Sequence, residues 1–306
     1  MTDSRFVERT DPDEVFALLS NDTRVRTLRA LWEAEDRTAT FSELREAVGM
    51  QDSGQFNYHL DELVGRFVAR TEDGYELTRA GKLINGAIEA GAYTSEGSID
   101  PLELEEPCPT CGGARTFRYE DETVRVECDA CPVSYRFGVP PAAFAGHDRE
   151  AIPDVASRHL RTKVDRTTSG FCPFCDGPVT PAVTPVPEID PDADGGDEHE
   201  HAAEALSERP EDIPWVRYTC RQCGAEPTVG LSLAFVGHPA VVSFHYTRGV
   251  DLEERDVWDF AEADPDHQVV RSREPFRASV TYEADGDTLT LTVDEDMAVV
   301  DIEESV

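Results

Sequence analysis

Lysine is nearly missing from this chain of 306 residues, in which Lys82 and Lys163 stand against 63 acidic side chains. Every other basic residue is arginine, and the net charge is −35. Such a surface repels itself strongly in dilute buffer. In molar salt the Debye length falls to about 3 Å, so that repulsion is screened. The composition therefore resembles that of a halophile's cytosolic protein more than that of an acidic protein from a mesophile.

Two kinds of segment are also missing. No apolar run approaches the length of a membrane span. The first residues, beginning with Met1, contain no charged-then-apolar leader. We therefore expect a cytoplasmic protein with no membrane partner, in a compartment where thiols stay reduced.

The negative charge is unevenly distributed along the chain. Residues 1–92 contain 11 basic and 18 acidic side chains, a net charge of −7, whereas the rest contains 17 and 45, a net charge of −28. An acidic chain is normally a poor ligand for nucleic acid. In high salt, however, counterion release contributes little to binding, and hydrogen bonds and shape contribute more. The overall charge therefore does not exclude DNA, and the first third is the part least repelled by phosphate.

All eight cysteines fall into four Cys-x-x-Cys pairs. Two residues between the cysteines allow a tight turn to direct both sulfurs at one ion, and two such turns complete a closed tetrahedral zinc site. We predict two structural Zn²⁺ ions rather than disulfides, redox thiols or an iron–sulfur cluster. A closed site leaves no position for a water molecule, so it organises the fold and does not catalyse. The pairs are Cys108 and Cys111, Cys128 and Cys131, Cys172 and Cys175, and Cys220 and Cys223.

The cysteine region repeats weakly. Residues 108–113 resemble residues 172–177, and residues 124–128 resemble residues 216–220. We therefore predict two tandem zinc ribbon–strand–helix units, at 107–168 and 169–265. Neighbouring pairs are expected to share an ion, so that the pair at 108/111 joins the pair at 128/131 and the pair at 172/175 joins the pair at 220/223. A crossed arrangement remains possible.

Each second cysteine pair is followed by an apolar run that we interpret as strand, and then by a polar helix. In the first unit these segments are Ser134 to Val139 and residues 148–166. In the second they are Val229 to Phe235 with Val241 to Tyr246, followed by residues 251–263.

Two other segments of the second half have distinct compositions. Residues 186–214 are rich in Asp, Glu, Pro and Gly, which predicts a disordered acidic insertion. His199 and His201 lie within it and are expected to be solvated rather than to bind metal. Residues 266–306 alternate apolar and polar side chains around Asp285-Gly286, which predicts a β-hairpin with one buried face.

The first 93 residues are predicted to be helical with one hairpin. Pro12 opens a short first helix, and Asn21 or Asp22 caps the second. A third helix ends at Gly49, and Asp52 or Ser53 caps a fourth. A hairpin then turns at Asp73-Gly74, and residues 79–92 form a last helix. Residues 94–106 are expected to be a linker.

This order resembles the winged helix-turn-helix, and three motifs resemble ArsR-type repressors. Leu18-Leu19-Ser20-Asn21-Asp22-Thr23-Arg24-Val25-Arg26 is similar to the opening of that family, and Gln55-Phe56-Asn57-Tyr58-His59-Leu60-Asp61-Glu62-Leu63 to its recognition helix. Leu77-Thr78-Arg79-Ala80-Gly81 is similar to the motif after its wing. The chain is identified as a member of this class, of haloarchaeal type, with tandem zinc ribbons added. The resemblance covers about the first ninety residues.

The resemblance implies binding of double-stranded DNA by a homodimer built on the first and last helices of this domain. It places the fourth helix in the major groove. Metal-sensing ArsR proteins have cysteines on the helix equivalent to residues 41–48, and because this chain has none there, metal sensing is not carried over.

The candidate base-reading residues lie on the fourth helix. Ser53, Gln55, Asn57 and Tyr58 are expected to project away from its apolar side, and Gln and Asn can pair bidentately with adenine. Asp61 and Glu62 would repel phosphate unless they point elsewhere, and an exposed polar face can also be merely solvated. Additional candidates are His59, which matches the family's histidine, and the arginines expected at phosphate or on the wing: Arg24, Arg26, Arg45, Arg66 and Arg70.

The leading hypothesis is a sequence-specific transcriptional regulator whose zinc module binds a partner or effector. An alternative is a general transcription adaptor that contacts RNA polymerase, because the archaeal general transcription factor E alpha subunit also has a winged helix followed by a zinc ribbon. A third class, an enzyme with an accessory zinc ribbon, is disfavoured because no phosphate loop, nucleophile elbow or HExxH motif occurs. The expected fold class is α+β multidomain: the winged helix, two zinc units and the terminal hairpin.

Overall fold

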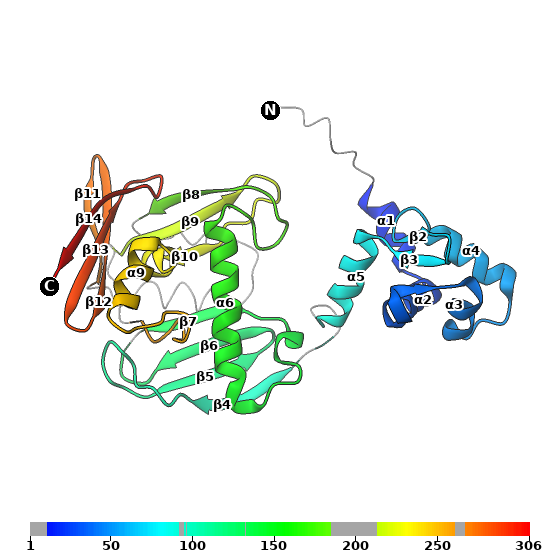
Figure 1. Ribbon diagram of the computed structural model, residues 1–306, viewed down its shortest axis with the longest axis horizontal. Coiled ribbons are helices and arrows are strands. Elements are labelled where there is room, and N and C mark those ends of the chain that lie inside the picture. The colour runs from blue at the N-terminus through cyan, green and yellow to red at the C-terminus, as the bar shows by residue number, and fades with distance from the viewer. Residues whose placement is uncertain (1–10, 92–94, 96, 132, 185–212, 261–266) are drawn as a thin grey trace. The chain divides into compact units, whose positions relative to one another are not determined.

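The computed structural model describes residues 11–91, 95, 97–131, 133–184, 213–260 and 267–306. The chain divides into two compact units, unit 1 comprising Met1–Ser95 and unit 2 comprising Glu96–Val306 (Figure 1). Both units combine helices with small antiparallel sheets, so the predicted α+β class is confirmed at that level. None of the described helices is both long and apolar enough to cross a bilayer.

Unit 1 alternates helices with very short strands. Its three strands form one antiparallel sheet in the order β1-β3-β2. The elements, in chain order, are α1 (Pro12–Leu19), α2 (Asp22–Glu33), a 3₁₀ turn (Glu35–Arg37), β1 (Thr38–Ala39), α3 (Phe41–Val48), α4 (Ser53–Leu63), β2 (Val68–Arg70), β3 (Tyr75–Leu77) and α5 (Arg79–Glu89).

The helices of unit 1 begin where the sequence provides capping side chains. The Asn21 side chain accepts hydrogen bonds from the N–H groups of Thr23 and Arg24, and Asp52 caps α4 in the same way. Thr40 and Glu43 form a reciprocal capping box at α3. Between the caps, Phe56, Leu60 and Leu63 on one side of α4 pack into the core of the unit, where they are fully buried.

Unit 2 begins with a four-stranded antiparallel sheet, in the order β4-β5-β6-β7, and one long helix. The strands are β4 (Ser98–Glu103), β5 (Arg115–Glu120), β6 (Thr123–Cys128) and β7 (Ser134–Gly138). Two 3₁₀ turns (Pro141–Phe144 and Arg149–Ala151) lead into α6 (Ile152–Thr168). Phe117, Tyr119, Val124 and Val126 form the buried face of the sheet, and α6 contributes Val155 and Ala156 to the same core.

Two further sheets complete unit 2. The second has the order β8-β9-β10, with strands β8 (Val179–Thr184), β9 (Trp215–Cys220) and β10 (Thr228–Gly230). Helices α8 (Leu231–Phe235) and α9 (Pro239–Thr247) follow. The third is a meander of β11 (Gln268–Arg273), β12 (Phe276–Ala284), β13 (Asp287–Val293) and β14 (Val299–Ser305).

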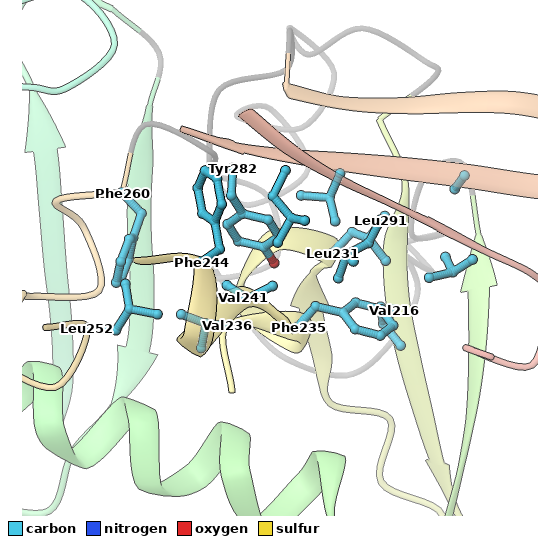
Figure 2. Packing of buried hydrophobic residues seen from close by; sticks show 14 of the residues in the cluster. Val216, Leu231, Phe235, Val236, Val241, Phe244, Leu252, Phe260, Tyr282 and Leu291 are labelled. Atoms are coloured by element: carbon cyan, nitrogen blue, oxygen red, sulfur yellow. The ribbon is translucent and has the colours of Figure 1, made fainter. Parts of the chain in front are cut away.

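The second and third sheets share one apolar core. Leu231 and Val241, from α8 and α9, lie against Tyr282 and Leu291 of the third sheet, and Val216 contributes from β9 (Figure 2). The Tyr282 hydroxyl donates a hydrogen bond of 2.7 Å to the Ser232 carbonyl, so this buried phenol has a partner.

The first sheet is tied to a distant part of unit 2 through Arg115 and Trp258. Trp258 is 1% exposed and packs with Phe117, Tyr135 and Phe137. Arg115 is 3% exposed and donates to the Trp258 carbonyl at 2.7 Å and to the Asp259 carboxylate at 2.7 Å. A buried guanidinium needs such partners, because an unpaired buried charge is strongly destabilising.

Several sequence predictions for unit 2 are wrong. Most of the apolar run from Val229 to Phe235 and the run from Val241 to Tyr246 form helices α8 and α9 instead of strands. Short apolar runs fit a buried helix as well as a strand, and Pro239 with the His238 cap starts a helix here. Residues 251–260 form turns rather than a polar helix, because Val257 and Trp258 pack against the first sheet.

Two further predictions for the same region need correction. The expected linker at 94–106 contains β4, which pairs with β5. The expected terminal hairpin is the central β12–β13 pair of a four-stranded sheet, completed by β11 and β14. Nearly all of the predicted acidic insertion at 186–214, with His199 and His201, lies outside the described residues.

One glycine of unit 1 is required by a close backbone approach. A Cβ added at Gly81, in the first turn of α5, would lie 2.2 Å from the Phe67 carbonyl oxygen and 3.1 Å from Leu77 Cδ2. The same helix contains Gly86, where an added Cβ would meet nothing within 4 Å. The glycine of the Leu-Thr-x-x-Gly motif therefore permits α5 to approach the strand side of the core.

We predict opposite effects for the same substitution at these two positions. Gly81→Ala should destabilise unit 1 by about 1–3 kcal/mol, because the overlap forces the backbone apart. Gly86→Ala should stabilise it by up to about 1 kcal/mol through helix propensity. Denaturant dependence of hydrogen exchange at the α4 amides measures both, and equal effects at the two positions would contradict the packing argument.

Candidate metal centres and candidate nucleic-acid interface

The eight cysteines form two groups of four at corresponding places in unit 2. In the first group, two cysteines precede β5 and two lie at the turn between β6 and β7. In the second, two precede β8 and two lie at the turn after β9. Within each group the four Sγ atoms lie within 4.8 Å of one another, and the groups are Cys108, Cys111, Cys128, Cys131 and Cys172, Cys175, Cys220, Cys223. The neighbouring pairs therefore come together, and the crossed arrangement does not occur.

The sulfur spacing fits a tetrahedral metal ion. The Sγ atoms of Cys108 and Cys131 are 3.7 Å apart, and those of Cys111 and Cys128 are 3.4 Å apart. In the second group the corresponding distances are 3.7 Å and 3.5 Å. Metal–sulfur bonds of about 2.3 Å in a tetrahedron place the sulfurs about 3.8 Å apart. No disulfide joins any of the eight cysteines. Each group could thus hold one metal ion.

The turns that carry the cysteines share one backbone geometry. The Cys108 N–H donates to the carbonyl of Gly113, and the Cys172 N–H donates to that of Gly177. The Cys220 N–H bonds Ala225 in the same manner, five residues on. Such turns direct backbone N–H groups at sulfur. The donors are Gly113 to Cys111 at 3.4 Å, Ala130 to Cys128 at 3.5 Å, Phe174 to Cys172 at 3.5 Å and Gln222 to Cys220 at 3.4 Å.

These donors favour the thiolate at one cysteine of each group. The Cys223 N–H lowers the pKa of Cys220 to about 6, with a smaller opposing effect from burial. Burial opposes ionisation of Cys128, but the Ala130 N–H and the neighbouring thiols together lower its pKa to about 7. Against the effect of the Gly177 N–H, the neighbouring thiols raise the pKa of Cys175 to about 12, and burial with the neighbouring thiols does the same at Cys131. Because the thiolate is the form that binds metal, each group offers one readily ionised ligand near neutral pH.

Two glycines support the sites in a way that sequence reasoning missed. A Cβ at Gly113 would lie 2.7 Å from Ala130 Cβ and 3.0 Å from Cys128 Sγ, on the facing turn. At Gly177 it would lie 2.5 Å from Gln222 Cβ. Glycine at this place lets the two turns of a group approach each other. The signal was available in the sequence, since both segments read Cys-Pro-x-Cys-x-Gly.

In unit 1, the N-terminal half of α4 presents a polar surface. Ser53, Gln55 and Asn57 are exposed, and the Tyr58 side chain is 57% exposed. The helix turns its apolar side to the core, so these side chains project outward as predicted.

The two acids of α4 are both paired with arginines. The Asp61 carboxylate accepts from the Asn57 amide at 2.7 Å and from Arg70 of β2 at 3.2 Å. Glu62 forms a 3.2 Å ion pair with Arg24 of α2. These arginines offset the negative charge of the helix that was expected to repel phosphate.

Two residues that the sequence placed at DNA are buried. Arg24 is 8% exposed. Its guanidinium donates a hydrogen bond to the Leu18 carbonyl and lies 5.8 Å from the centre of the Tyr58 ring. Arg24, in α2, thereby contacts both α1 and α4. His59 is also 8% exposed and contacts the Tyr58 ring edge-on. Both side chains are thus packed within unit 1, and little of either is exposed. The helical pattern missed this because burial depends on packing that only the folded chain forms.

The remaining candidate arginines lie at the surface or partly so. Arg26 pairs with Asp22 at 2.6 Å and donates to the Val48 carbonyl, and Arg70 is held by Asp61. Within the part of the chain that the structure describes, Arg45 and Arg66 form no ion pair, so their guanidinium groups remain available to an anion.

Comparison with protein families matches two segments of the chain. Residues 105–299, well over half of the sequence, match a domain of unknown function, DUF7351. Residues 12–88 match a second domain of unknown function, DUF7347. No curated protein and no solved structure matches the chain. The longer match contains both cysteine groups, and the shorter contains α1 through α4 and most of α5.

We predict that the two groups bind metal independently. Elemental analysis of the purified chain should find two metal equivalents, and Cys108→Ser or Cys172→Ser should each leave one. Acidification should release the metal, because protons compete for the thiolates. Losing a structural ion of this type removes about 10 kcal/mol or more of folding free energy, so chelation should also abolish the exchange protection of β5–β6 and β8–β9. A metal-free chain that keeps this protection would show that the clusters need no ion.

Proposed function

The chain belongs to the DUF7351 family, and from its own two kinds of site we propose that it is a sequence-specific DNA-binding transcriptional regulator with a zinc-stabilised partner or effector module. The observation that carries the proposal is the exposed row Ser53, Gln55, Asn57 and Tyr58 on the N-terminal half of α4. Amide and hydroxyl side chains on an exposed helix are the groups that read base edges in the major groove.

The arrangement around α4 supports this proposal. A helix α3 precedes α4 across a short turn, and the β2–β3 hairpin follows it, which is the order of a winged helix-turn-helix of ArsR-like type. Arg66 follows the C-terminal end of α4, and Arg70 of the β2–β3 hairpin pairs with Asp61 near the same end, so positive charge accompanies the helix there. Both acids of α4 are neutralised by arginine, so the repulsion expected from Asp61 and Glu62 is offset.

A homodimer is part of the proposal. Phe16 on α1 and Leu83 on α5 are 62% and 63% exposed, and large apolar side chains at this exposure are suited to burial against a second copy. These are the first and last helices of unit 1, so a dimer formed there leaves α4 free. Two copies of α4 would then read half-sites about 34 Å apart, or a multiple of that distance.

We propose zinc as the metal of both cysteine groups. Four thiolates at tetrahedral spacing form a closed site, which zinc occupies in structural roles. Cys172 and Cys175 lie in the segment that connects α6 to β8. An ion bound to the second group would therefore fix the position of the chain where it enters the second sheet. The proposed role of both ions is structural, and the protein is proposed to act by binding rather than by catalysis.

Base reading and phosphate binding should separate by mutation. In molar KCl, the wild-type chain should give a footprint on genomic fragments with two half-sites. Replacing Gln55 and Asn57 together by Ala should weaken the binding free energy for the selected site by about 1–3 kcal/mol per lost base contact. The binding free energy for other DNA should change little. Arg66→Gln should weaken binding to all sequences alike and reduce the salt slope by about one.

Two outcomes would contradict the proposal that the chain is a sequence-specific regulator. Binding without sequence preference, unchanged by the double substitution, would remove α4 as the reader. Co-purification with RNA polymerase without any footprint would instead favour an adaptor role for the same units.

A further inference from the structure

Unit 2 contains a pocket whose lining includes none of the eight cysteines. Its volume is about 400 Å³, which is within the range of small-molecule sites. Four parts of unit 2 contribute to it: the C-terminal turn of α6, strands β8 and β9, the α8 region, and the loop between β13 and β14. Its lining includes Asp165, Tyr218, Leu233, Phe235, His238 and Met297.

The apolar side of the pocket is aromatic and polarizable. Phe235 and His238 meet edge-on with ring centres 6.1 Å apart, and Met297 lies on the same lining. Figure 2 shows Phe235 at the margin of the shared core, close to Val216 of β9. Aromatic faces attract cations through their quadrupole, in addition to burying apolar surface.

Asp165 gives the pocket a negative charge that nothing in the described chain neutralises. Arg166, the next residue, pairs with Asp176, and the Lys163 ammonium donates to the Gly138 carbonyl at 2.6 Å. Among the residues that the structure describes, no arginine or lysine lines the pocket. Asp165 also stands in the last turn of α6, where the helix dipole favours positive charge.

Two other polar groups of the pocket are His238 and Tyr218. His238 Nδ1 accepts a hydrogen bond from the Ala240 N–H at 3.3 Å. Tyr218 is 2% exposed, and its hydroxyl has no hydrogen-bond partner among the described residues.

From this convergence we propose that the pocket binds an organic ammonium ion. The cationic head lies between the Asp165 carboxylate, the end of α6 and the rings of Phe235 and His238, and the apolar body lies against Leu233 and Met297. An organic anion is excluded by the same charges, because it would meet an unpaired carboxylate and the negative end of a helix. The proposal is independent of DNA binding, since neither α4 nor the metal groups contribute to the pocket.

Choline and its uncharged isostere 3,3-dimethyl-1-butanol test the charge requirement, because they share shape and hydroxyl. Titration of the full-length, metal-loaded chain in molar KCl should give one choline site with a dissociation constant at least ten times lower than that of the isostere. Asp165→Asn should reduce the choline affinity to that of the isostere. Asp154→Asn, a carboxylate on the same helix that pairs with Arg158 and does not line the pocket, should leave it unchanged.

A second measurement locates the site without relying on the charge variant. Magnetisation transfer from the choline methyl protons should reach the Met297 methyl group, and Met297→Trp should fill the pocket and weaken choline and isostere together. Equal affinity for the two probes, equal effects of the two aspartate substitutions, or many weak choline sites spread over the acidic surface would each overturn the proposal. A chain that binds choline as expected but does not bind DNA would contradict the regulator proposal and leave the ammonium site supported.

Discussion

Four sulfur atoms at near van der Waals distance, twice over, are the constraint on which unit 2 depends. Thiolates so close repel one another, and a divalent cation at their centre would replace that repulsion by attraction to all four sulfurs. The β5–β6 and β8–β9 hairpins are each joined at one end to a cysteine turn, so the ion would hold two chain segments that are distant in sequence. Gly113 and Gly177 matter because they permit the facing turns to reach that distance.

The two cysteine groups are nevertheless parts of one body. The turn region at 251–260 comes from beyond the second group, yet Val257 and Trp258 complete the core of the first sheet. Arg115 secures this contact with hydrogen bonds to Trp258 and Asp259. The second sheet shares its own core with the third sheet through α8 and α9. Each small sheet of unit 2 therefore needs side chains from another segment to complete its core, and none of them could bury its apolar face alone.

Arginine has a comparable role in unit 1, where it reconciles an acidic composition with an exposed polar helix. Arg24 of α2 pairs with Glu62, and Arg70 of β2 pairs with Asp61. Exposed pairs of this kind contribute little stability in molar salt, but Arg24 is buried and links three helices. The proposed duplex-reading surface is therefore a patch of neutral hydrogen-bonding groups, suited to conditions in which counterion release contributes little.

Local signals in the sequence determined much of this protein. Caps at Asn21 and Asp52 and the turn at Gly49 located helices of unit 1, because these residues satisfy or end the backbone hydrogen bonding within a few residues. The spacing of the cysteines likewise indicated which pairs would share a site. The tertiary structure alone decided the rest: the helical state of the apolar runs in α8 and α9, the irregular path at 251–260, and the burial of Arg24 and His59. An apolar run is stable as helix or strand according to the surface it meets, and that surface is built from residues far away along the chain.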